Sequence, residues 1–203
     1  AEILAEPLPD DPDLFCVTTA MQHYARTVAL AASGDVEGAT AERGRFLAAR
    51  DRVPESRILF NNTCLAILEV AEAMLEGELA YRKGAHDEAF ERLRRAVALD
   101  DALPYDEPWA WMQPTRHALG ALLLEQGRTD EAEAVYRADL GLDGTLARAC
   151  QHPDNVWSLH GLHECLVRRG AEVEARMIRP RLDIARARAD VPIRASCYCR
   201  AAA

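Results

Sequence analysis

The chain has 203 residues, of which 49% are hydrophobic and only 6% aromatic, and its formal net charge is −9. A chain of this length can bury one full hydrophobic core, and its many alanines and leucines, the strongest helix formers, predict an all-α protein. The negative charge opposes the phosphate backbone, so we expect no nucleic-acid partner. No run approaches the roughly 20 apolar residues of a spanning helix, so we expect no membrane partner and a cytoplasmic protein.

The cysteines and the N-terminus indicate the redox state of the thiols and the processing of the chain. Six cysteines, at positions 16, 64, 150, 165, 197 and 199, lack the spacing of a small disulfide-bonded scaffold, so we expect reduced thiols. A secretory signal has a basic region followed by an apolar region, and the first residues of the chain do not show this pattern. Because the chain begins with Ala1 rather than methionine, we expect a processed, tagged or truncated product.

One pattern occurs four times along the chain. An apolar helical stretch is followed by a glycine and, five residues later, by an alanine: Gly34 and Ala39, Gly84 and Ala89, Gly127 and Ala132, Gly170 and Ala175. Glycine closes a tight turn in the left-handed conformation, and alanine lets two helices pack closely. The pattern predicts helix–turn–helix repeats at about 18–50, 63–101, 112–142 and 155–189, with an extended tail at 190–203, in a single domain spanning 1–203.

The two central repeats, GELAYRKGAHDEAFERLRRAVALD and GALLLEQGRTDEAEAVYRADL, resemble the tetratricopeptide repeat (TPR) family. Gly77 and Gly120 match the small residue of the first helix, Ala96 matches an alanine of the second helix, and Tyr136 matches its aromatic residue. The resemblance implies an α-solenoid of about four repeats. In the outer repeats His163 stands at a small-residue position, where we expect it to pack between helices.

Whole segments of the chain are also similar to the C-terminal half of larger bacterial and fungal TPR-domain proteins of mostly unassigned function. These segments are TAMQHYAR (19–26), VALDDALPYDEPWAW (97–111), HPDNVWSLHGLHECL (152–166) and ADVPIRASCYCR (189–200). This similarity implies an N-terminal helical region or a partner chain beside the first repeat.

Long junctions at 50–62, 100–114 and 140–155 separate the repeats. The segment 104–117 reads either as a lid with aromatic residues or as a hydrophobic plug between repeats, and we favour the plug. Asp106 and Glu107 could act as acid and base, but adjacent carboxylates in a turn are usually solvated or capping. His152, in the last junction, is expected to be solvated.

The TPR resemblance also predicts a binding groove, because the first helices of such repeats line a concave surface. The residues that it places in the groove are Tyr24, Met74, His117, Trp157, His160 and Glu164. We therefore expect a binding module for a protein, a peptide or a small molecule. An aromatic and acidic groove suits an apolar or cationic ligand, or a metal.

The alternative is a metal-binding or thiol-dependent enzyme. His117, His160, Cys197 and Cys199 form the sharpest candidate set, since imidazole and thiolate are the usual ligands of zinc, copper and iron. Glu164 would then be the catalytic base. Without a metal, a tail thiol would be the nucleophile and His160 would activate it. The opposing interpretation is that the histidines only pack and the thiols are unligated.

Overall fold

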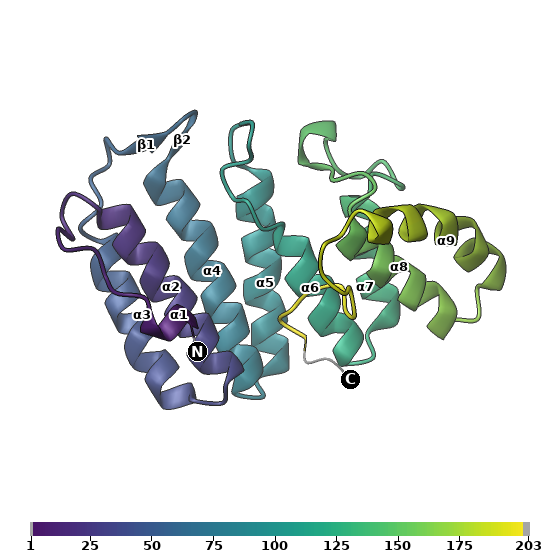
Figure 1. Cartoon of the computed structure of the whole chain (residues 1–203), viewed down its shortest axis with the longest axis horizontal. Helices are drawn as coiled ribbons and strands as arrows, with labels where there is room; N and C mark the ends of the chain where they lie inside the picture. The colour runs from purple at the N-terminus through teal and green to yellow at the C-terminus, as the bar shows by residue number, and fades with distance from the viewer. Residues whose placement is uncertain (1, 201–203) are drawn as a thin grey trace. The chain divides into compact units, whose positions relative to one another are not determined.

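The computed structural model describes residues 2–200, so Ala1 and residues 201–203 of the predicted domain and tail lie outside the described residues. The described chain is mostly helical (Figure 1), which confirms the all-α class. It divides into two compact parts, which we call unit 1 (up to Met112) and unit 2 (from Gln113).

Unit 1 contains two long helical hairpins. After the short α1 (Glu2–Ala5), helices α2 (Cys16–Ala32) and α3 (Val36–Arg50) pair, and α4 (Cys64–Arg82) pairs with α5 (His86–Asp101). Helix α2 also packs on α4, and this contact joins the two hairpins. Between them, β1 (Ile58–Leu59) and β2 (Asn62–Thr63) form a small antiparallel hairpin. Its turn holds Phe60 at a φ of 52°, a left-handed conformation that is uncommon for a bulky residue.

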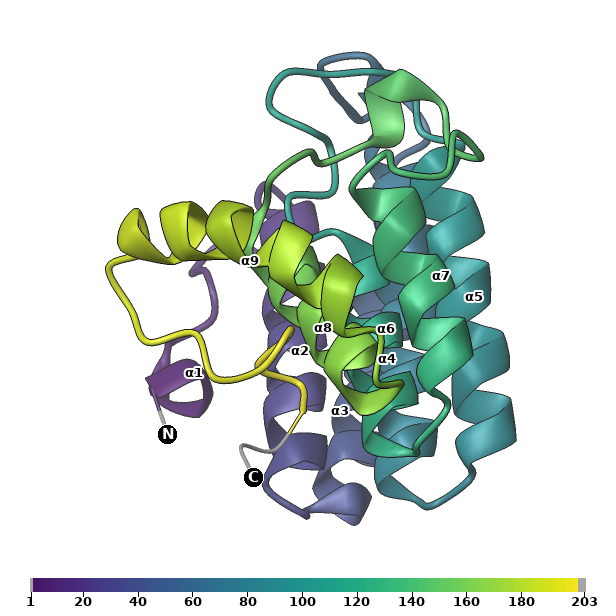
Figure 2. The same ribbon diagram turned by 90° about the vertical axis from the view of Figure 1, so that its right-hand side faces the viewer.

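Unit 2 contains two shorter helical hairpins and the tail. Helices α6 (Thr115–Glu125) and α7 (Thr129–Asp139) pair, and α8 (Val156–Arg168) packs on α7 and on α9 (Glu172–Ala187). A loop with the short 3₁₀ helix η1 (Arg148–Cys150) joins α7 to α8. Figure 2 shows the tail leaving the end of α9 and turning back past α8.

Helix pairs occur in all four ranges where the glycine pattern predicts them. The four turn glycines have φ values between 70° and 88°, the left-handed conformation that their positions require. The side chains of Asp35, Thr63 and Asn155 accept hydrogen bonds from the first turns of α3, α4 and α8. These local signals explain where the helices begin and end.

Tyr136 is the center of the packing in unit 2. Its ring is fully buried on α7, between a glycine of α6 and a glycine of α8. A Cβ atom at Gly120 would lie 2.5 Å from the Cζ atom of Tyr136, and one at Gly161 would also overlap the ring. Gly161, rather than His163, therefore makes the close contact of α8 with Tyr136. His163 is half-buried, and its packing between helices stays a prediction.

The segment 104–117 agrees only in part with the interpretation as a hydrophobic plug. Trp111 is buried and meets the Tyr24 ring edge-on, with ring centroids 5.6 Å apart. Trp109 is 44% exposed. Asp106 is buried rather than solvated, since it accepts hydrogen bonds from the Asn61 backbone and from the Asn62 side chain. It therefore ties the β1–β2 hairpin to this loop.

Among residues 2–200, the helices do not combine the length and the apolar character that a membrane span requires.

Candidate functional site

A pocket of about 370 Å³ opens in unit 2 between α8, α9 and the tail. Four of its lining side chains are arginines: Arg168 from α8, Arg186 from α9, and Arg194 and Arg200 from the tail. We call it the arginine pocket. Three residues of α8 complete its polar wall: His160, His163 and Glu164.

Among the described residues of this lining, Glu164 is the one acidic side chain, and two arginines hold it. Its Oε2 accepts from Arg200 at 2.8 Å, and its Oε1 accepts from Arg168 at 2.5 Å. Burial alone would raise the pKa of Glu164, but the Arg200 hydrogen bond and the charges of Arg200 and Arg168 outweigh it and lower that pKa. The same hydrogen bond raises the pKa of Arg200. Glu164 is therefore ionised and neutralises part of the charge.

His160 is held as a neutral ring. Its Nδ1 lies 2.8 Å from the guanidinium of Arg186. Because arginine has only donors, Nδ1 must accept this hydrogen bond, and the ring proton sits on Nε2. Burial and then the Arg186 charge lower the pKa of His160. Burial, with the charges of Arg179 and Arg186, also lowers the pKa of His163.

The pocket is thus strongly cationic within a chain whose net charge is −9. Four arginines face a single carboxylate, and both histidines favour their neutral form. Arg194 is exposed and makes no ion pair within the described part of the chain. The buried Nε of Arg186 has no acceptor among the described residues, although buried donors are normally paired. The exposed guanidinium of Arg194 and the excess of arginine charge therefore remain for an anionic group.

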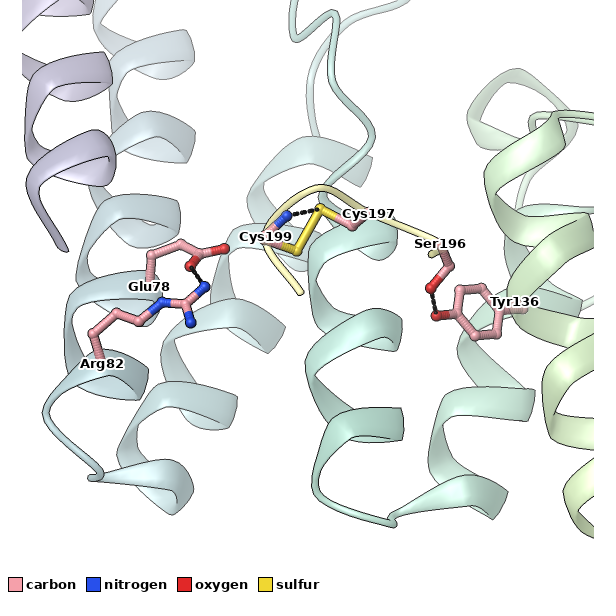
Figure 3. Close-up of a disulfide and its surroundings, with 6 residues drawn as sticks. All are labelled: Glu78, Arg82, Tyr136, Ser196, Cys197 and Cys199. Atoms are coloured by element: carbon pink, nitrogen blue, oxygen red, sulfur yellow. Dashed lines mark hydrogen bonds and ion pairs between the residues drawn. A yellow bond between two sulfur atoms is a disulfide. The ribbon is translucent and has the colours of Figure 1, made fainter. Parts of the chain in front are cut away.

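The tail is attached to the helices through alternate residues, the first of which, Ser196, is drawn in Figure 3. The Ser196 hydroxyl lies 2.5 Å from the Tyr136 hydroxyl, and both side chains are buried. The Tyr198 ring meets the Trp157 ring edge-on at 5.1 Å. Arg200 donates to Glu164, as described above. The tail thereby closes one side of the arginine pocket.

The two tail cysteines lie between these attachments and are bonded to each other. A disulfide joins Cys197 and Cys199, whereas Cys16, Cys64, Cys150 and Cys165 take no part in a disulfide within the described residues. The expectation of six reduced thiols is therefore wrong for the tail pair. Nothing in the sequence pattern distinguished a CxC disulfide from two free thiols.

A second polar cluster surrounds Asp139 at the end of α7. Its fully buried carboxylate accepts hydrogen bonds from four side chains. The donors and their distances are His117 Nε2 at 3.2 Å, His152 Nδ1 at 2.8 Å, Asn155 Nδ2 at 2.8 Å and Ser158 Oγ at 2.5 Å.

This cluster fastens the 140–155 junction to α6, α7 and α8. Burial would raise the pKa of Asp139, but the hydrogen bonds from His117 and His152 outweigh it and hold that pKa well below its usual range. Ser158 is buried and donates to Asp139 rather than to a histidine, so the arrangement differs from an activated serine. His152 is part of the cluster, and the expectation that it is solvated is wrong.

The residues expected in the groove lie in different surroundings. In unit 1, Met74 is buried. Burial raises the pKa of Tyr24, and the negative charge of Glu78 raises it further. In unit 2, His117 belongs to the Asp139 cluster and Trp157 packs on the tail. His160 and Glu164 line the arginine pocket.

The predicted metal ligands have other partners. His117 is bonded to Asp139, Nδ1 of His160 accepts from Arg186, and Cys197 is bonded to Cys199. Within residues 2–200, no three side chains of the histidine, cysteine, aspartate and glutamate types form a group able to hold a metal ion.

Sequence reasoning missed the arginines of α9 and of the tail. It described the surroundings of His160 as aromatic and acidic, whereas the structure surrounds this residue with guanidinium groups. The available signal was the arginine-rich composition of α9 and the tail, but it does not tell which arginines reach α8.

Comparison of the chain with protein-family models, with curated proteins and with solved structures finds no match in any of the three.

Proposed function

We propose that the chain is a helical-repeat binding module and that the arginine pocket binds a small molecule or peptide through a carboxylate or phosphate group. The observation that carries this proposal is the gathering of four arginines against one carboxylate around a single pocket. Guanidinium groups match the planar or tetrahedral oxygens of such anions with paired hydrogen bonds. The resemblance to TPR proteins supports the binding class.

The volume of the pocket limits the size of the ligand that it can hold. Its volume of about 370 Å³ is near the lower end of the roughly 300–1,000 Å³ of small-molecule sites. Two or three charge-assisted hydrogen bonds, at roughly 1.5–3 kcal/mol each, would reach the roughly 4 kcal/mol of millimolar affinity. We therefore expect a simple anion to saturate the site at about millimolar concentration.

The observed bonding favours anion binding over the metal-binding or thiol-dependent enzyme. The donors of Arg194 remain available, whereas the sulfur atoms of Cys197 and Cys199 are used in a disulfide. The proposal is therefore limited to binding and assigns Glu164 a part in holding two arginines instead of a catalytic one.

Isothermal titration calorimetry with inorganic phosphate and with succinate tests the proposal, since the two probes separate phosphate from carboxylate recognition. Arg194→Gln removes a guanidinium without a partner in the described chain, so its folding should be unchanged. Because the substitution removes one charge-assisted hydrogen bond, we expect affinity to fall about tenfold. Arg176→Gln, on the exposed face of α9, is the matched control and should bind as the unmodified chain does.

The proposal fails if neither probe binds saturably at low ionic strength. It also fails if Arg194→Gln and Arg176→Gln lose affinity equally, because general charge attraction would then explain the binding.

A further inference from the structure

The tail places two cysteines between three attachment points. Residues 196, 198 and 200 contact α7 and α8, and the residues between them, Cys197 and Cys199, form the disulfide. Arg200, which lines the arginine pocket, directly follows this bond. The state of the two sulfur atoms is therefore coupled through a single peptide unit to a pocket residue.

The disulfide also determines the path of the chain at Arg200. It holds the Cα atoms of Cys197 and Cys199 5.3 Å apart, whereas two residues of fully extended chain span roughly 7 Å. The turn is closed further by the Arg200 N–H, which donates to the Cys197 carbonyl at 3.3 Å. Breaking the sulfur–sulfur bond would allow this turn to extend and would change the direction in which Arg200 leaves it.

The tail pair is the most accessible sulfur chemistry near the pocket. Cys197 and Cys199 are half-buried, and Tyr198 between them is 71% exposed. In contrast, Cys165 on α8 is fully buried, and burial raises its thiol pKa to about 12. A thiolate is the species that takes part in exchange, so Cys165 is a poor participant.

We propose that Cys197 and Cys199 form a thiol–disulfide exchange site, whose co-reactant is a small dithiol or its cyclic disulfide, and that it sets the anion affinity of the arginine pocket. This inference rests on the proposed function. With the disulfide formed, Arg200 is held at the pocket. With the disulfide reduced, the end of the tail loosens, and the pocket loses the fixed position of Arg200.

A dithiol reduces the Cys197–Cys199 disulfide in two steps. A thiolate of the dithiol attacks one cysteine sulfur, the Cys197–Cys199 bond breaks, and the other cysteine leaves as a thiolate that takes up a proton. The second thiol of the reagent, as thiolate, then attacks the mixed disulfide and releases the first cysteine, which is also protonated. The protein gains two electrons and two protons, and the dithiol is oxidised to its cyclic disulfide.

Titration of phosphate and succinate into oxidised and dithiothreitol-reduced protein tests the inference. A thiol assay in denaturant should find four thiols per chain in the oxidised form and six after reduction. We expect reduction to weaken probe binding about tenfold. The Cys197→Ser/Cys199→Ser double variant should bind weakly with or without dithiothreitol, whereas Cys150→Ser should respond as the unmodified chain does.

A readout without the ligand separates this inference from the proposed function. Hydrogen–deuterium exchange of the peptide containing residues 196–200 should accelerate on reduction, because the turn opens. If oxidised and reduced protein bind a probe equally, the anion site stands and the control by exchange is wrong. If the oxidised protein binds neither probe, the proposed function fails and the inference falls with it. Six thiols in protein treated with oxidised dithiothreitol would also overturn the inference.

Discussion

Replacement of Asp139 by alanine tests whether the buried cluster in unit 2 stabilises the fold. The carboxylate of Asp139 is fully buried and accepts hydrogen bonds from four side chains that lie on α6, on the 140–155 junction and on α8. Asp139→Ala removes the one acceptor that these donors share. Donors left buried without an acceptor cost free energy in the folded state alone.

The size of the effect follows from the number and kind of bonds. Each hydrogen bond to an ionised acceptor contributes roughly 1.5–3 kcal/mol, but the burial of the carboxylate offsets part of the sum. Removal of one partner from a buried charged network typically costs about 3–5 kcal/mol. We expect the free energy of unfolding to fall by this amount. For a chain of this length, the midpoint of thermal unfolding should then fall by roughly 6–20 °C.

Urea and thermal unfolding, followed by far-ultraviolet circular dichroism, measure the loss. Asp190→Ala, an exposed aspartate in the same unit, is the matched control and should change stability little. Asp139→Asn keeps the shape and one acceptor oxygen, so its loss should lie between those of the two alanine variants. The reasoning is refuted if Asp139→Ala unfolds within about 1 kcal/mol of the Asp190→Ala control.

The same cluster predicts a dependence on pH. Because the folded chain holds the pKa of Asp139 below its ordinary value of 3.8, the ionised form stabilises the fold above that value. This contribution is lost as the pH falls through the lower pKa of the folded state. The stability advantage of the unmodified chain over Asp139→Asn should therefore shrink in strong acid and stay constant near neutrality.

Two other predictions concern packing and a loop contact. Gly120→Ala would push a Cβ atom into the Tyr136 ring and should destabilise the protein by about 1–3 kcal/mol in urea unfolding. Gly44→Ala, in an exposed helix position with no atom nearby, should instead stabilise it by about 0.5–1 kcal/mol. If both substitutions changed the free energy of unfolding in the same direction, the packing argument would be contradicted. Asp106→Ala should free the β1–β2 hairpin and speed hydrogen exchange at the Asn61 amide, and unchanged exchange would show that this contact does not hold the loop.

The helical architecture was predictable from short stretches of sequence. Glycine needs no neighbour to take a left-handed turn, and the turn glycines Gly84 and Gly127 both adopt it. The close approach at Gly120 and the aromatic position of Tyr136 followed from the resemblance to TPR repeats, and the structure places these two residues in contact. Whether the helix pairs continue as a TPR solenoid remains a prediction.

The candidate site was predictable only in its α8 residues. His160 and Glu164 lie four residues apart on one helix, so their shared face follows from helical periodicity, and both line the pocket. The partner of His160 was expected to be His117, but His117 lies in the Asp139 cluster. Asp139 itself was not among the candidate residues of the sequence.

The sequence by itself determined the all-α class and the places of the helix pairs with their glycine turns, because these depend on residues within one or two turns of each other. Only the tertiary structure decided which charges meet. Arg186 and Arg200 reach His160 and Glu164 across 26 and 36 residues of chain. Those contacts depend on how α9 packs and where the tail turns, which hydrophobic periodicity does not specify. The cationic character of the pocket and the assembly of the Asp139 cluster both come from that long-range packing.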